Sequence, residues 1–222
     1  AKELEALCPH LRRPVQLIVN PIDEAGIRLQ AGQPISVDLS KGWFVAIGRL
    51  TPAKGFDRLL ELLSSSPPEV KVLFIGEGPE RSRLESLAES LTVSDQVQFI
   101  GFQDNPWSIL ARSRGLIMMS RWEGLPNVAL EALACGVPVY GLESVDGLDE
   151  IQEKTQQGAV VLAPNSKALA HFLSTSSNSV SKSDELAASL LPAAFESAVV
   201  RQQFITLLEK ALHERHGRAE SE

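Results

Sequence analysis

The chain has 222 residues, of which 44% are hydrophobic and 22% are charged, and its formal net charge is −7. This length and composition suffice for one large domain or two small domains with a buried core. The acidic balance argues against nucleic acid as the main partner, because phosphate backbones require clustered lysines and arginines. It does not exclude a small anionic ligand held by two or three local cations.

Two cysteines, Cys8 and Cys135, are too few for a disulfide framework in a chain of this size and indicate a reducing compartment. Cys135 lies among apolar residues and is interpreted as a small buried thiol. No run approaches the roughly 20 apolar residues that span a membrane. We therefore expect a cytoplasmic protein, with contact at the inner face of a membrane left open. Since the chain begins at Ala1 without Met or a hydrophobic leader, we expect a domain of a longer protein.

The predicted elements begin with a loose lead-in over residues 1–40, in which 15–19 is a candidate strand. From residue 41 onward, apolar runs of strand length alternate with stretches of helical spacing. The predicted strands are 43–47, 70–75, 97–100, 115–119, 137–140 and 159–162. The predicted helices are 54–63, 79–91, a short helix after Pro106, and 126–135, in which Pro126 takes the first helical position.

The strands are apolar along nearly their whole length, which is typical of strands buried on both faces of a parallel sheet. Their alternation with helices predicts a doubly wound, Rossmann-like α/β domain with helices on both faces, over residues 41–192. The segment 193–222 is predicted as a final helix, ending near residue 213, and a frayed tail. A Ser-rich segment at 174–185 is predicted as an exposed loop. In such folds ligands bind at the carboxyl ends of the strands, so the residues after each apolar run are candidates.

The first candidate group follows the strand at 43–47 and has the sequence Gly48-Arg49-Leu-Thr-Pro-Ala-Lys54-Gly55. Arg49 and Lys54 would lie at a strand end beside a helix N-terminus. Two cations in that position suit a diphosphate, because arginine offers a planar fork of donors and lysine a mobile point charge. Ordinary surface cations are the alternative for either residue taken alone.

The second group, Gly76-Glu-Gly78-Pro79, lies between a strand and a helix. The dinucleotide pattern G-x-G-x-x-G fails at its third glycine, which is Arg81 here, so an NAD-binding domain is disfavoured. A tight turn is the simpler interpretation, although Gly78 would still let the backbone approach a ligand closely.

The third group consists of Glu123 in a loop and Glu131, eight positions later, in the following helix. A glycosidase would need two carboxyl groups facing each other across one bond, about 5–10 Å apart, which this loop–helix arrangement makes awkward. Two separate tasks fit better, with Glu131 accepting from a ribose diol and Glu123 near a sugar. A surface or capping carboxylate is the alternative for each. For Glu131 the apolar neighbours predict burial, and a buried carboxylate needs a partner.

The sequence contains no P-loop and no G-x-S-x-G nucleophile motif. The four histidines lie near the termini or on a predicted surface helix: His10, His171, His213 and His216. This placement argues against a metal site or a catalytic triad built on histidine.

Four strings occur in order along residues 44–173: GRLTPAKGFD, FIGEGPER, VQFIGF and EGLPNVALEALACGVPV. Together they resemble the C-terminal, donor-binding domain of retaining glycosyltransferases with the GT-B fold, in particular family 4. Glu123 and Glu131 match the E-x7-E signature of that family. The resemblance implies one half of a GT-B enzyme, whose N-terminal acceptor-binding domain is missing from this chain.

The resemblance also implies a role for each matched residue. Arg49 and Lys54 would contact the donor diphosphate, and Glu123 would support the positive charge that develops at the anomeric carbon. Glu131 would bind the ribose hydroxyls. The other implied donor-binding residues are Gly48 and Gly78, Gly101 and Phe102 at the nucleobase, and Leu125, Asn127 and Val128 at a phosphate.

The expected reaction is transfer of a hexose-type sugar from a nucleoside diphosphate, UDP by expectation, to an unknown acceptor with retention. No metal and no cofactor are expected, because the cations and the helix dipole would stabilise the leaving diphosphate. The chain alone is expected to bind nucleoside diphosphate weakly and transfer nothing, since a second lobe must close over the sugar. Two alternatives stay open: a phosphorylase or sugar-phosphate synthase on the same fold, and a non-catalytic nucleotide-binding interaction domain.

Overall fold

The computed structural model describes residues 18–176 and 186–219, with side chains described as far as residue 212. The chain divides into two compact units. The larger unit is Asp23–Pro192, and the smaller unit combines Ala1–Ile22 with Ala193–Glu222. Every residue predicted to belong to the site lies in the larger unit.

Some predictions lie outside the described residues. These are the environments of Cys8 and His10, the first three residues of the candidate strand at 15–19, and most of the Ser-rich segment. Residues 18 and 19, which are described, belong to no strand.

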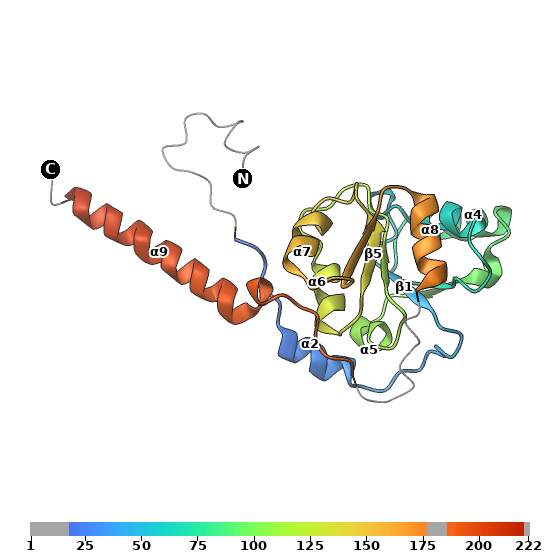
Figure 1. The fold of residues 1–222 in the computed structure, drawn as a ribbon, viewed down its shortest axis with the longest axis horizontal. Helices are drawn as coiled ribbons and strands as arrows, with labels where there is room; N and C mark the ends of the chain where they lie inside the picture. Colours follow the sequence, from blue (N-terminus) through green and yellow to red (C-terminus); the bar gives the residue numbers. More distant parts are fainter. Residues whose placement is uncertain (1–17, 177–185, 220–222) are drawn as a thin grey trace. The chain divides into compact units, whose positions relative to one another are not determined.

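The larger unit contains a six-stranded parallel sheet with the order β3-β2-β1-β4-β5-β6 (Figure 1). The order reverses beside β1, because the chain passes from β1 to β2 and β3 on one side and then returns to β4 on the other. Such a reversal opens a crevice at the carboxyl ends of the two strands. The strands are β1 Phe44–Ile47, β2 Val72–Ile75, β3 Val97–Gly101, β4 Leu116–Met118, β5 Val139–Leu142 and β6 Val160–Ala163.

Helices cover the sheet in two groups. One group packs α3 against α4 and α8, and the other packs α2 against α5 and α6. Figure 1 shows α6 and α7 on one side of β5 and α8 on the other, so the predicted doubly wound sheet with helices on both faces is confirmed. The helices are α2 Glu24–Ala31, α3 Phe56–Ser64, α4 Arg81–Ser90, α5 Pro106–Leu110, α6 Asn127–Ala134, α7 Leu148–Lys154 and α8 Ser166–Thr175, with short 3-10 turns η1 Pro52–Lys54 and η2 Ser94–Gln96.

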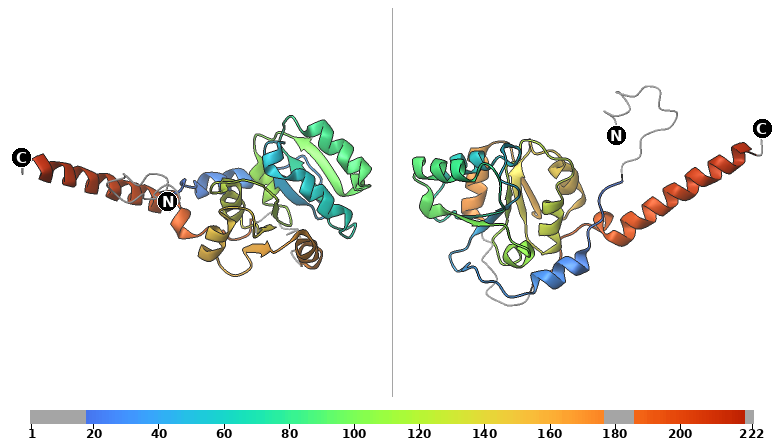
Figure 2. Two further views of the ribbon diagram at one scale, coloured as in Figure 1. Left: turned by 90° about the horizontal axis from the view of Figure 1, so that it is seen from above. Right: turned by 180° about the vertical axis from the view of Figure 1, so that it is seen from behind.

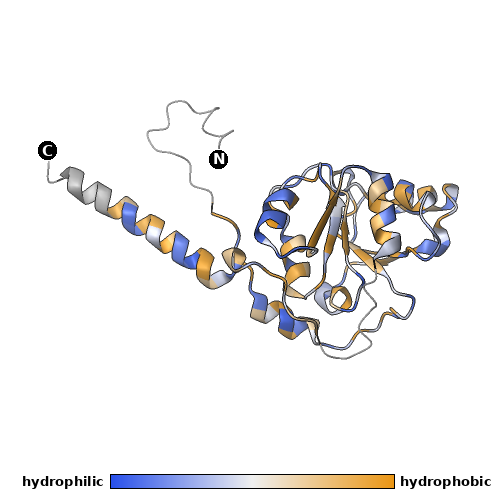
Figure 3. Ribbon diagram, in the orientation of Figure 1, coloured by the Kyte–Doolittle hydropathy of each residue, from blue (hydrophilic) through white to orange (hydrophobic). Residues whose placement is uncertain are grey.

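The core includes strands that are buried along their whole length, as their apolar sequences predict, whereas the edge strand β3 is buried only at Gly101. Strands β2 and β5 are buried at every position, and Figure 3 shows the strands as the most continuously hydrophobic elements of this unit. Aromatic rings join the sheet to its helices. Phe74 of β2 packs edge-on against Phe56 of α3, with ring centroids 5.4 Å apart, and stacks on Phe99 at 4.6 Å.

Several element boundaries differ from the prediction. Helix α2 lies inside the predicted lead-in, where the Asp23 side chain caps it by accepting from Gly26 N at 3.1 Å. Pro126 is not the first helical residue, because its extended ψ of 96° places it at the N-cap and α6 begins at Asn127. Strand β5 begins at Val139, two residues after the predicted start at 137. Each difference reflects local geometry that hydrophobic periodicity does not register.

The smaller unit contains η3 Ala193–Phe195 and the long helix α9, Ser197–Ala219, which both views of Figure 2 show as unbroken. Ile22 joins this unit by pairing with Glu196 and by donating its backbone N–H to the carbonyl oxygen of Phe195 at 3.0 Å. The helix continues beyond its predicted end near residue 213. Over the described stretches of the chain, we find no helix with the length and hydropathy needed to cross a bilayer.

Candidate active site

Two residues predicted as catalytic are in direct contact beside the point where the strand order reverses. Lys54 ends η1, in the loop after β1, and Glu123 lies in the loop after β4. Lys54 Nζ donates to Glu123 Oε1 at 2.6 Å, and Ser120 Oγ donates to the same oxygen at 2.7 Å. The side chains are 26% and 12% exposed, so this ion pair is largely covered. The two loops therefore meet through a charged pair at the crevice where the fold favours ligand binding.

A pocket of about 430 Å³ lies at the carboxyl ends of β1, β2 and β3. Three of the predicted site residues line it: Gly48, Arg49 and Phe102. Arg49 is exposed and its guanidinium makes no hydrogen bond to another described residue, while the Phe102 side chain is 70% exposed. The remaining lining residues are Ile47, Ile75, Gly76, Glu77, Gln103 and Pro106.

The side-chain stem of Lys54 connects the ion pair to this pocket. A Cβ atom added at Gly48 would lie 3.1 Å from Lys54 Cε and 3.3 Å from Lys54 Cδ. Lys54 therefore passes directly over Gly48, which itself lines the pocket. The structure thus brings Arg49, Lys54 and Glu123 to one edge of the sheet.

Glu131 belongs to the same region but has a different environment. It lies in α6, and its Oε2 accepts a hydrogen bond of 2.9 Å from Trp107 Nε1. Trp107 follows Pro106, a residue that lines the pocket. Burial raises the pKa of the Glu131 carboxyl, and the hydrogen bond from Trp107 offsets part of this effect. A partly buried carboxylate with a raised pKa is the kind of group that clusters at functional sites.

Gly78 and Gly101 are positions of close backbone approach around the pocket. A Cβ atom at Gly78 would lie 2.4 Å from Leu50 O, and one at Gly101 would lie 2.9 Å from Glu77 Oε1. Larger residues at either position would displace their neighbours. Neither glycine is itself among the lining residues.

The last predicted residues, Leu125, Asn127 and Val128, surround the start of α6. Pro126 supplies the N-cap position, and its carbonyl oxygen accepts from Ala129 N at 3.0 Å. Glu131 lies four residues after Asn127, or just over one helical turn, so the N-terminus of α6 and the Glu131 carboxylate belong to one short element. None of the three predicted residues lines the pocket.

Several residues that contact the predicted site residues or their loops were not predicted from the sequence. Ser120 follows the end of β4 by two residues, and this position at the carboxyl end of a strand could have indicated it. No sequence pattern indicates that Trp107 belongs to the site, because its hydrogen-bond partner Glu131 lies 24 positions away. The same holds for Arg121 and Asp57, which form a bidentate ion pair with both N···O distances at 2.8 Å.

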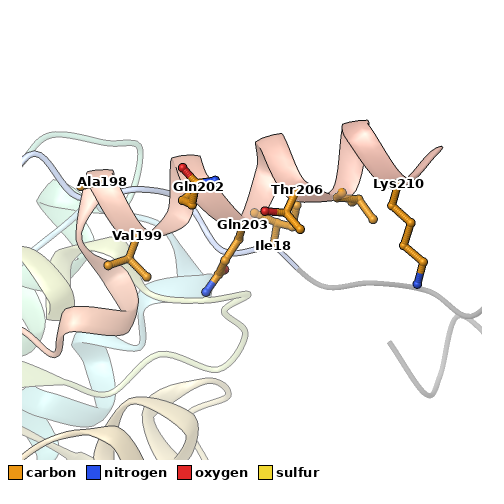
Figure 4. A pocket seen from close by; sticks show the side chains of 8 residues that line it. Ile18, Ala198, Val199, Gln202, Gln203, Thr206 and Lys210 are labelled. Atoms are coloured by element: carbon orange, nitrogen blue, oxygen red, sulfur yellow. The ribbon is translucent and has the colours of Figure 1, made fainter. Parts of the chain in front are cut away.

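A second pocket, of about 880 Å³, belongs to the smaller unit and lies between Ile18 and one face of α9 (Figure 4). Among the described residues that line it, Gln202, Gln203 and Thr206 supply most of the polar groups, and Lys210 is the one charged residue. It contains none of the predicted site residues. Nothing in this lining corresponds to the paired acidic and basic groups of the larger unit.

The described residues contain no group of three or more histidine, cysteine, aspartate or glutamate side chains arranged to hold a metal ion. The expectation that the reaction proceeds without a metal stays a prediction.

Comparison with known proteins places this geometry in a family. The model of the family described as "Glycosyl transferases group 1" matches residues 33–188. An uncharacterized glycosyltransferase of Methanocaldococcus jannaschii is 34% identical over 111 residues, which are 49% of this chain and 27% of that protein. The Campylobacter jejuni N-acetylgalactosamine-N,N'-diacetylbacillosaminyl-diphospho-undecaprenol 4-alpha-N-acetylgalactosaminyltransferase is 26% identical over 160 residues, or 72% of this chain and 43% of that enzyme.

Among solved structures, Anabaena HepE in complex with UDP and glucose superposes with a TM-score of 0.68 at 23% identity. The match covers 88% of this chain and 57% of that chain, and it supports the fold. The chain spans less than half the length of the curated relatives it matches. Because the family model covers well over half of the chain, the protein belongs to the glycosyl transferases group 1 family.

Proposed function

We propose that this chain is the C-terminal, donor-binding half of a retaining glycosyltransferase of family 4. It binds a nucleoside-diphosphate sugar, UDP carrying a hexose-type sugar, and an N-terminal domain outside this chain binds the acceptor. The enzyme works in the cytoplasm and needs no metal.

One observation carries this proposal: Lys54 and Glu123 are in contact beside the reversal of strand order, next to a pocket that includes Arg49. A nucleotide-sugar donor presents a diphosphate, which attracts cations, and a reacting anomeric carbon, which attracts a carboxylate as it gains positive charge. The site offers both kinds of group within one ion pair. An ammonium group has three donors, so Lys54 can keep its bond to Glu123 while another donor contacts a phosphate oxygen.

The remaining residues fit the rest of such a donor. Phe102 gives an exposed aromatic surface at the pocket, where a nucleobase can stack. Glu131 uses Oε2 for Trp107 and can accept from ribose hydroxyls at its other oxygen. Preorganised cations at the leaving diphosphate would provide electrostatic catalysis without a metal ion.

The names of similar proteins support the sugar class. The Campylobacter relative is named for transfer of N-acetylgalactosamine, and the Anabaena neighbour holds UDP and glucose. Both names involve hexose-type sugars. We extend that class, and UDP as the nucleotide, to this chain.

The first test is calorimetric titration of the chain with UDP, GDP, ADP and NAD. We expect weak binding of UDP and none of NAD, because Arg81 replaces the last glycine of the dinucleotide pattern. Lys54→Ala should weaken UDP binding by about ten- to hundredfold, the usual range for a lost charge-assisted hydrogen bond. Lys154→Ala, which removes an exposed pair with Glu150 on α7, is the matched control. Binding of NAD in preference to every nucleoside diphosphate would contradict the proposal.

The second test is turnover. The chain alone should transfer no sugar, whereas the whole protein should do so and should lose about 10²–10³-fold in rate with Glu123→Gln. The anomeric configuration of the product, measured by NMR, tests retention. Consumption of phosphate or of a sugar phosphate would instead support a phosphorylase or synthase. Full activity of the whole protein after Glu123→Ala would support a non-catalytic interaction domain.

A further inference from the structure

The loops that carry Lys54 and Glu123 are joined by two residues that have no part in the proposed donor contacts. Arg121 lies two residues before Glu123, and Asp57 lies in the first turn of α3, three residues after Lys54. Arg121 Nη1 and Nη2 each donate to one oxygen of Asp57, both at 2.8 Å. The pair is only partly exposed, at 32% for Arg121 and 17% for Asp57.

Arg121 also holds the turn that presents Lys54. Its Nη1 donates to the carbonyl oxygen of Pro52 at 2.9 Å, and its backbone N–H donates to the carbonyl oxygen of Ala53 at 2.8 Å. Both acceptors belong to η1, the 3-10 turn that ends at Lys54. One residue of the Glu123 loop therefore makes four hydrogen bonds to the segment 52–57.

The backbones of the two loops also approach each other closely. Gly55 has φ +63°, and a Cβ atom there would lie 2.0 Å from the carbonyl oxygen of Met119. Only glycine permits this approach together with a left-handed conformation. The position of η1 is thus fixed from the side of β4 both by Arg121 and by the Gly55–Met119 contact.

We propose that Arg121 is a positioning residue that, with Asp57, sets the geometry between Lys54 and Glu123, an inference that rests on the proposed function. We call these two residues the Arg121–Asp57 clamp. A bidentate guanidinium–carboxylate pair fixes orientation as well as distance, which a lysine at position 121 could not do. The clamp holds Lys54 beside Glu123 before a donor binds, so that less ordering has to accompany binding.

The charge balance of the clamp agrees with a positioning role rather than a direct ligand role. Hydrogen bonds from Arg121 hold the pKa of the Asp57 carboxyl below its usual range, so Asp57 is ionised at neutral pH. The positive charge of Arg121 is therefore matched within the clamp, whereas the Arg49 guanidinium makes no hydrogen bond to another described residue. A diphosphate would find its available cations at Arg49 and Lys54.

The test is a double-mutant cycle on the whole chain with UDP titration as the readout. Arg121→Ala should raise the dissociation constant for UDP about tenfold in the native background, as expected for coupled neighbours. In a Lys54→Ala background the same change should alter it by less than about twofold, because the group being positioned is gone. Asp57→Asn keeps the side-chain shape and weakens the Arg121–Asp57 contact less severely, so it replaces Arg121→Ala in the cycle if that variant folds poorly.

The matched control is Arg114→Ala. Arg114 lies just before β4, whereas Arg121 lies just after it. Like Arg121, Arg114 joins distant segments: it donates to Ser176 O at 2.9 Å, and its guanidinium lies over the Phe44 ring at 4.6 Å. Arg114→Ala should lower the free energy of unfolding without changing UDP affinity. Hydrogen exchange should become faster in segments 51–57 and 119–124 in Arg121→Ala, and in neither segment in Arg114→Ala.

Equal losses of UDP affinity in the two backgrounds, or unchanged exchange in both segments, would overturn the clamp as a positioning device. Should the native chain bind none of UDP, GDP and ADP, the proposed function fails. The hydrogen-exchange comparison then tests the clamp independently of UDP binding. Retained protection of segment 51–57 in Arg121→Ala would show that Arg121 does not hold η1.

Discussion

At the scale of single residues, the two glutamates of the site differ in how their charge is balanced. Glu123 accepts hydrogen bonds from Lys54 and Ser120, so its charge is compensated within the chain. Glu131 has Trp107 as a neutral donor and is half-buried, and burial raises its pKa. Keeping Glu131 ionised therefore lowers the stability of the folded chain, as is common for groups retained for function.

Glu131→Gln should accordingly stabilise the chain. Above the raised folded-state pKa the native carboxylate is ionised in both the folded and unfolded states, and burial disfavours it only in the folded state. The substitution should raise the free energy of unfolding by about 1 kcal/mol at pH 7. This gain should shrink as the pH falls through the raised folded-state pKa, and should vanish below 4.5, the ordinary value, where glutamate is protonated in both states.

Urea unfolding at several pH values measures the gain in stability of Glu131→Gln, and UDP titration measures the change in UDP affinity. UDP affinity should fall in Glu131→Gln, because a neutral amide is a weaker acceptor for ribose hydroxyls. Glu89→Gln, at an exposed position of α4, serves as the control and should change neither quantity. A loss of stability in Glu131→Gln at pH 7 would contradict this account of the Glu131 environment.

Cys135 is expected to be chemically inert in the folded chain. Its side chain is fully buried, and burial, together with the nearby Glu131 charge, raises the pKa of the thiol to about 12. The thiolate is the reactive form, so it is scarce at pH 8. In a Cys8→Ser variant, iodoacetamide should modify no thiol at pH 8 until urea unfolds the chain. Rapid modification of the folded variant would be inconsistent with a buried Cys135.

At the scale of elements, the contact between η1 and the end of β4 depends on Gly55. Gly55→Ala combines a left-handed backbone with a clash against the carbonyl oxygen of Met119. The two effects together should lower the free energy of unfolding by about 3 kcal/mol. Gly158 has φ +86° but no atom within 4 Å of an added Cβ, so Gly158→Ala should cost only about 1 kcal/mol.

Thermal and urea unfolding of the two glycine variants separate these contributions. Equal losses of stability would mean that backbone strain alone acts at Gly55 and that the Met119 carbonyl moves aside freely. A larger loss at Gly55 supports a rigid junction between the loops of Lys54 and Glu123.

At the scale of the whole molecule, the larger unit contains the sheet and every predicted site residue. A chain restricted to residues 23–192 should therefore fold cooperatively and bind UDP with the same affinity as the full chain, within about twofold. Circular dichroism with urea and calorimetric titration check the two statements. Loss of UDP binding in a shortened chain that still folds cooperatively would show that the smaller unit contributes to the donor site.

The sequence by itself determined the strands, the parallel doubly wound sheet and the edge of that sheet at which the candidate residues gather. Those features follow from local patterns, since apolar runs mark buried strands and each run ends where the next turn begins. The string EGLPNVALEALACGVPV also fixed Glu123 and Glu131 on one loop and one helix, because their spacing is short.

Only the tertiary structure decided which side chains meet. Lys54 and Glu123 are 69 positions apart, and Asp57 and Arg121 are 64 apart, so their contacts depend on β4 pairing beside β1. Hydrophobic periodicity shows that a strand is buried but not which strand lies next to it. Strand order is settled by packing of the complete sheet and its helices, and with it the ion pair, the clamp and the Trp107–Glu131 hydrogen bond.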